Sequence, residues 1–91
     1  MTSIEVACDP TDSVDGWTCR VRVDDATEHV VRVTPGELAR LAPGAATPDD
    51  LVRRSFEFLL VREPKESILR SFDLPVIGRY FPDYEREIRN R

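Results

Sequence analysis

The chain lacks the residue patterns by which most catalytic sites are recognised in a sequence. Its 91 residues include one histidine, two cysteines and four glycines. No serine or cysteine nucleophile can be placed beside a histidine base, and no glycine-rich loop is present to cradle a phosphate. No second histidine or cysteine lies at metal-ligand spacing from His29. We therefore predict a protein that is not an enzyme and that binds no cofactor, metal ion or small-molecule ligand.

Long apolar runs are also missing. Within the longest predicted helix, the longest uninterrupted apolar run is residues 58–61, which is far too short to span a bilayer. Residues 1–5 have neither the basic start nor the apolar stretch of a secretory signal. We therefore predict a cytoplasmic protein that does not associate with membranes.

The predicted compartment bears on the two cysteines, Cys8 and Cys19. They could face each other across two neighbouring strands and form a disulfide. Because cytosolic thiols are kept reduced, we instead predict that both are free and act as small buried apolar residues.

Basic charge is scarce and unevenly distributed. The formal net charge is −4 and the pI is about 4.9, which argues against general nucleic-acid binding. Residues 1–50 carry 4 basic and 10 acidic groups, a net charge of −6, whereas residues 51–91 carry 9 basic and 7 acidic groups, a net charge of +2. In the second half the basic residues alternate with acids, so it is not a polycationic tail.

The chain length sets the domain organisation, because 91 residues are enough for one domain but not for two. A domain of this size buries only about 60–65% of its unfolded surface, so its stability margin is thin and oligomerisation is a common remedy. We predict a single α+β domain over residues 1–91, with a β meander over about 1–34 and helices over 35–91.

Alternating apolar residues predict an N-terminal antiparallel sheet of two to three strands. A first strand is predicted over residues 3–8. Residues 17–24 alternate between apolar and polar, and residues 28–33 form the return strand of a hairpin over about 17–33. Because only one face of the hairpin is apolar, the helices are expected to cover that face. His29 lies at the end of the apolar face, which predicts a packed strand residue rather than a general base.

The strongest helix signal lies over about residues 48–63. Thr47 can cap the free N–H groups of the first turn, and Pro48 suits the first helical position. Pro64 ends the helix, because the residue before a proline avoids helical angles. The apolar arc of this helix is wide, which indicates burial by more than one neighbour.

Shorter helices are predicted on either side of this central one. Thr34 and Glu37 have the spacing of a capping box, which opens a short helix that Pro43 ends. After Pro64 the pattern breaks into short helical pieces, the first of them over residues 65–72.

Residues 67–81 have some features of a helix–turn–helix motif, in which the second helix would carry Arg79 into the major groove. Two features weaken this interpretation. The turn contains no glycine, and the second helix is only about six residues long before Pro82. The alternative function is a nucleic-acid-associated regulator that binds through Arg53, Arg54, Arg70 and Arg79.

Three runs in the second half carry a resemblance to known proteins. They are residues 52–60, 67–74 and 80–85, which read VRRSFEFLL, SILRSFDL and YFPDYE. Together they resemble a group of small bacterial proteins to which no function is assigned, with a looser likeness in the hairpin. The resemblance implies a bacterial, stand-alone domain and supplies no activity, ligand or catalytic residue.

The remaining features favour a protein-interaction module. The chain combines a thin stability margin, aromatic residues concentrated near its C-terminus and no recognisable catalytic set. Aromatic residues and arginines are enriched at interface hot spots. We predict a homodimer, or a subunit that docks on another protein, with an interface formed by Phe58, Val61, Arg79, Tyr80 and Tyr84. An alternative is that the three aromatic residues of this set belong to the core.

Overall fold

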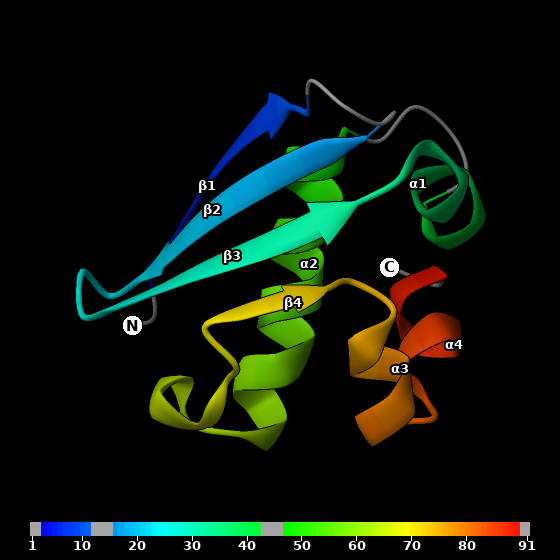
Figure 1. Ribbon diagram of the computed structural model, residues 1–91. Coiled ribbons are helices and arrows are strands. Elements are labelled where there is room, and N and C mark those ends of the chain that lie inside the picture. The colour runs from blue at the N-terminus through cyan, green and yellow to red at the C-terminus, as the bar shows by residue number, and fades with distance from the viewer. Residues whose placement is uncertain (1–2, 12–15, 43–46, 90–91) are drawn as a thin grey trace.

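The structure, a computed structural model, describes residues 3–11, 16–42 and 47–89. In these residues, one sheet packs against helices that come between its strands and after them in the chain (Figure 1). The elements in chain order are β1 (Ile4–Pro10), β2 (Trp17–Val23), β3 (Thr27–Val33), α1 (Pro35–Leu41), α2 (Pro48–Arg62), the 3-10 turn η1 (Lys65–Ser67), β4 (Ser71–Asp73), α3 (Val76–Tyr80) and α4 (Tyr84–Arg89).

The strands form one mixed sheet in the order β1-β2-β3-β4. β1 and β3 both pair antiparallel with β2, and β4 lies parallel to β3. The register places Val21 opposite both Val6 and His29, so the inward-facing positions of these three strands share one face. β1 and β4 form the two edges of the sheet (Figure 1).

Backbone conformation at two connections suits this register. Asp24 and Asp25 join β2 to β3 with φ angles of 54° and 55°, a left-handed region that aspartate tolerates better than most residues. Gly16 precedes β2 with a φ of 137°, and a Cβ atom there would lie 2.5 Å from the Val33 carbonyl oxygen. A side chain at position 16 would therefore collide with the end of β3.

α2 begins and ends close to where the sequence predicts. The Thr47 hydroxyl accepts a hydrogen bond from the Asp50 N–H at 3.1 Å, and Pro48 occupies the first turn. The last helical residue is Arg62, and Glu63 already has extended backbone angles before Pro64.

The core lies between α2 and the inner face of the sheet. Phe56 on α2 is fully buried, and its ring centroid lies 5.2 Å from that of His29 on β3 and 6.3 Å from that of Phe72 on β4. Burial of a side chain of this size contributes about 1.5–3 kcal/mol. α2 thus binds β3 and β4 into one unit.

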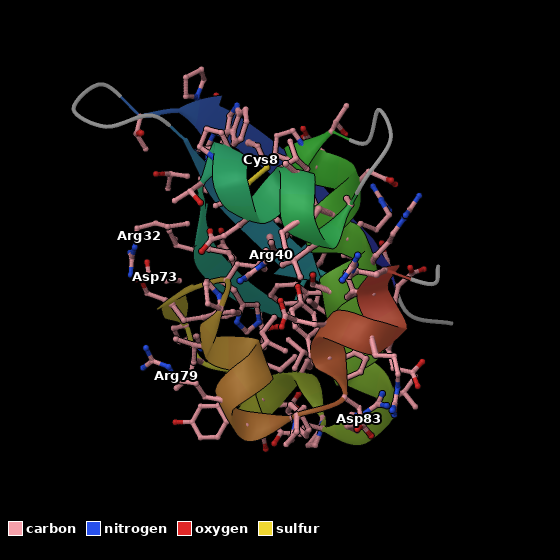
Figure 2. The ribbon with its side chains drawn as sticks, turned by 90° about the vertical axis from the view of Figure 1, so that its right-hand side faces the viewer. Cys8, Arg32, Arg40, Asp73, Arg79 and Asp83 are labelled. Carbon is pink, nitrogen blue, oxygen red and sulfur yellow. A yellow bond between two sulfur atoms is a disulfide. The ribbon has the colours of Figure 1, made fainter. Side chains whose placement is uncertain are left out.

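The outer face of the sheet carries charged side chains that pair across strands. Arg32 on β3 donates to the Asp73 carboxylate on β4 (Figure 2). At 3.3 Å, Arg32 also donates to the Ser71 hydroxyl. Exposed pairs of this kind contribute about 0–1 kcal/mol each. Two further pairs on this face join Arg20 to Asp9 and Arg22 to Glu28.

The α+β class and the hairpin are confirmed, but the sheet has one strand more than predicted. The predicted helix over 65–72 is wrong, because that segment forms η1 and then enters β4. The edge of β3 explains the difference. The Val30 N–H donates to the Arg70 carbonyl at 2.7 Å, and the Leu74 N–H donates to the Arg32 carbonyl at 3.0 Å. Backbone groups of β3 that β2 does not use are satisfied in this way.

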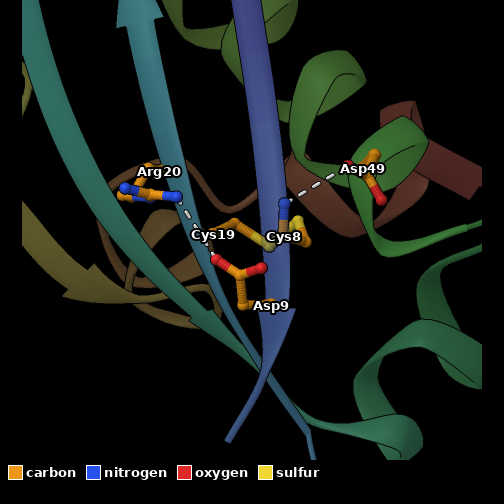
Figure 3. A network of polar contacts seen from close by, with 5 residues as sticks. All are labelled: Cys8, Asp9, Cys19, Arg20 and Asp49. Atoms are coloured by element: carbon orange, nitrogen blue, oxygen red, sulfur yellow. Dashed lines mark hydrogen bonds and ion pairs between the residues drawn. A yellow bond between two sulfur atoms is a disulfide. The ribbon is translucent and has the colours of Figure 1, made fainter.

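Cys8 on β1 and Cys19 on β2 form a disulfide (Figure 3). The register pairs the two residues directly, with their Cα atoms 3.9 Å apart. The prediction of two free thiols is therefore wrong. That prediction came from the expected compartment, whereas the strand pattern itself placed the cysteines face to face. The bridge ties the edge strand β1 to the buried strand β2.

Reduction of this disulfide is expected to destabilise the fold. The bridged residues are separated by 11 positions, and the chain entropy lost on closing a loop of that length corresponds to about 2–3 kcal/mol. Urea unfolding with and without dithiothreitol measures the difference, and a Cys8→Ala/Cys19→Ala double variant should be insensitive to the reductant. Two free thiols found by titration of the unfolded, unreduced protein would contradict the assignment.

Candidate functional site: a groove beside strand β4

His29 fixes the segment that leads into β4. Its Nδ1 atom lies 2.8 Å from the Leu69 carbonyl oxygen, and its Nε2 atom lies 3.0 Å from the Thr27 hydroxyl oxygen. A carbonyl can only accept, so Nδ1 carries a hydrogen, and in the neutral ring Nε2 accepts from the hydroxyl. The prediction that His29 is a packed strand residue is confirmed, since its side chain is buried and both of its ring nitrogens are hydrogen-bonded. One consequence is that the backbone of Leu69 is held against β3.

An apolar groove of about 230 Å³ lies next to this anchored segment. We call it the β4 groove, because it is enclosed by β4, the end of α2, the residues after η1, and α3. Glu63 is the only charged side chain that lines it among the described residues. The buried side chains in its wall are Leu59, Ile68, Phe72 and Ile77.

Two large apolar side chains at the β4 groove are exposed. Leu69 retains 48% and Tyr80 retains 69% of its accessible surface. Isolated exposed apolar residues are ordinary on protein surfaces, but a hollow apolar surface with exposed apolar neighbours is typical of interaction sites. The groove and these two residues therefore form the candidate site.

The β1 edge of the sheet is partly covered by α2. The Cys8 N–H donates to the Asp49 carboxylate at 3.3 Å (Figure 3), and the Arg53 guanidinium donates to the Ile4 carbonyl at 2.8 Å. Both side chains come from α2 and occupy backbone groups that point away from β2. Side chains placed in this way hinder pairing of an edge strand with another chain.

The β4 edge has no comparable cover. The ladder to β3 uses the Arg70 carbonyl and the Leu74 N–H, so alternation along the strand turns the backbone groups of Ser71 and Asp73 away from β3. Within residues 3–11, 16–42 and 47–89, no hydrogen bond reaches these outward N–H and C=O groups. The open edge and the β4 groove lie side by side.

Two of the five predicted interface residues lie in the core, which corrects their assignment to a surface. Phe58 is fully buried, and only 1% of Tyr84 is exposed. Their rings meet edge to face with centroids 5.4 Å apart, and the Arg62 guanidinium covers the Phe58 ring at 3.7 Å. Phe58, within the wide apolar arc of α2, therefore packs against α4.

The other three predicted interface residues are exposed but do not lie together in one hollow. Tyr80 lines the β4 groove, whereas Val61, at 79% exposure, does not. Arg79 instead lines a second hollow of about 350 Å³ at the C-terminal ends of β3 and β4, together with Arg32 and Trp17. In this second hollow, the charge of Arg32 is matched by Asp73.

The four arginines of the nucleic-acid alternative come from different elements: two lie on α2, one precedes β4, and Arg79 lies on α3. Arg53 binds the backbone of β1, and Arg54 pairs with Asp50 at 2.8 Å. Arg70 directly precedes β4, which lies three strand spacings, about 14 Å, from β1. The helix–turn–helix interpretation of residues 67–81 is also wrong, because β4 occupies the middle of that segment.

Sequence reasoning missed Leu69 and Phe72 as parts of a site, because both were assigned to the apolar stripe of a helix. A signal for the strand was present. Phe72 and Leu74 are apolar, whereas Ser71 and Asp73 between them are polar, which is the alternation of a half-buried strand. Such a short run is ambiguous until the open edge of β3 is known.

The described residues contain no cluster of histidine, cysteine and acidic side chains suited to a metal ion. None of their helices is long and apolar enough to cross a membrane. Comparison of the chain with protein-family models, with curated proteins and with solved structures gave no match.

Tyr84→Phe is expected to lower the free energy of unfolding by about 1 kcal/mol at neutral pH, because the buried phenol lies 2.6 Å from the Ser55 hydroxyl. Burial raises the pKa of Tyr84. A raised folded-state pKa means that the stabilisation is complete below the unfolded pKa of about 10 and is lost as pH rises above it.

Urea unfolding of both proteins across pH 7–11 measures this effect. At about pH 11 the wild type should have lost roughly 1.4 kcal/mol relative to the variant, which removes its advantage of about 1 kcal/mol. Tyr80→Phe serves as the matched control, because Tyr80 is exposed. A stability difference between wild type and Tyr84→Phe that stays constant over this range would contradict the burial of the phenol.

Proposed function

We propose that the protein is a non-catalytic protein-interaction module, or a homodimeric accessory protein, that binds a polypeptide at the β4 groove. The observation that carries the proposal is the exposure of Leu69 and Tyr80 beside the buried apolar wall of this groove. Burying these two side chains against a partner removes apolar surface from water, which stabilises the complex by about 25 cal/mol per Å². A tyrosine beside an apolar pocket is also a typical hot-spot residue.

The anchoring of Leu69 supports a preformed site. Its carbonyl accepts from the buried His29, and the neighbouring Phe72 packs on Phe56 of α2. A groove whose wall is held by core contacts loses little conformational entropy on binding, which favours affinity.

The cytoplasmic location predicted from the sequence is not part of this proposal. The Cys8–Cys19 disulfide counts against it, because such bonds are rare in proteins of the cytosol and persist in oxidising compartments. The nucleic-acid alternative is not favoured, since Arg53 contacts the β1 edge of the sheet whereas Arg70 lies next to the β4 edge.

Photo-cross-linking tests this function. A benzophenone-bearing amino acid replaces Tyr80, and the protein is irradiated in extracts of cells that produce it. We expect a cross-linked polypeptide whose yield drops at least several-fold when Leu69→Asp is added, because a carboxylate at the rim opposes burial in the groove.

The same probe at Val61 is the matched control, because Val61 is exposed but does not line the groove. Equal yields from positions 61 and 80, or a yield from position 80 that ignores Leu69→Asp, would show that the β4 groove is not the binding surface.

A further inference from the structure

We infer that the β4 edge pairs with the β4 edge of a second copy of this chain, giving an antiparallel two-fold dimer with one continuous sheet. This inference rests on the proposed function, since it assigns an occupant to the same groove. It starts from the difference between the two edges, one partly capped by α2 side chains and the other open.

The outward backbone groups of β4 suit a two-fold partner. Ser71 and Asp73 each direct an N–H and a C=O away from β3. In an antiparallel pair centred on Phe72, Ser71 of one copy lies opposite Asp73 of the other, and the reverse holds across the axis. Each such pair exchanges both hydrogen bonds, so this register satisfies all the outward groups of both strands.

Charge favours the same register. Ser71 and Asp73 have their side chains on the outer face, where Arg32 contacts both. The antiparallel register places each Asp73 carboxylate opposite a Ser71 hydroxyl of the other copy. A parallel, in-register pairing would place the two carboxylates opposite each other, which is destabilising. Each carboxylate in the dimer keeps its own Arg32.

The apolar surface at the edge would be covered by the same contact. Phe72, at the centre of the register, forms part of the groove wall, and the exposed Leu69 and Tyr80 line the groove on either side of it in sequence. In Figure 1, β4 lies at the lower edge of the sheet, between η1 and α3. A strand added there would run along the groove, which is how strand addition combines backbone bonds with side-chain pockets.

Sedimentation velocity over a concentration series from micromolar to millimolar tests the dimer. The wild type should shift from the mass of one 10.4 kDa chain towards that of two. Ser71→Pro removes an outward N–H without touching the ladder to β3, and should weaken association roughly tenfold or more. Ser71→Ala separates the loss of the N–H from the loss of the hydroxyl, and should weaken association less than Ser71→Pro does, because it keeps the N–H.

If Ser71→Pro fails to unfold cooperatively, Tyr80→Asp replaces it, because Tyr80 is exposed and its substitution leaves the core intact. A wild type that stays monomeric at millimolar concentration overturns the dimer. So does a dimer that neither variant weakens. In the monomeric case, Leu69-dependent cross-linking to a different polypeptide at position 80 would still support the proposed function, whereas its absence would remove both.

Discussion

The packing of α2 across one face of the sheet is the contact on which the rest of the structure depends. Phe56 joins this helix to β3 through His29 and to β4 through Phe72. The same helix supplies Phe58 and Ser55, against which Tyr84 seats α4. Because α2 packs against both the sheet and α4, its apolar arc is wider than that of a helix that is covered from one side only.

The position of α2 also makes the two edges of the sheet unequal. Its first half runs beside β1, where Asp49 and Arg53 take up backbone groups of the edge strand. Its end reaches the β4 groove through Leu59, where it contributes an apolar wall and no cap for the strand. One edge strand of the sheet, β1, has some of its backbone groups bonded to α2, and the other, β4, is open beside an apolar groove. An additional strand would therefore pair with β4 more readily than with β1.

Features set by local chemistry were predictable from the sequence. The start of α2 at Thr47 and Pro48, its end before Pro64, and the β2–β3 hairpin follow from capping, proline geometry and alternation. β4 was not predictable in this way, because its three residues form a strand only where the edge of β3 offers partners.

The candidate site was predicted only in part, for a related reason. Tyr80 was named from the sequence, but the backbone of Leu69 is held by a hydrogen bond to His29, forty positions earlier in the chain. Phe58 and Tyr84 were predicted to form an interface because aromatic residues are common there. Only the placement of α4 on α2 shows that they pack against each other in the core.

Amide hydrogen exchange at β4, followed by NMR, tests the central claim most directly. In dilute protein, the Ser71 and Asp73 amides should exchange quickly, whereas the Phe72 amide, which alternation turns towards β3, should be protected. Raising the protein concentration should slow exchange at Ser71 and Asp73 and leave Phe72 unchanged. Equal protection of all three amides at every concentration would contradict an open edge, and rapid exchange of Ser71 and Asp73 that persists at high concentration would contradict its pairing with a second copy.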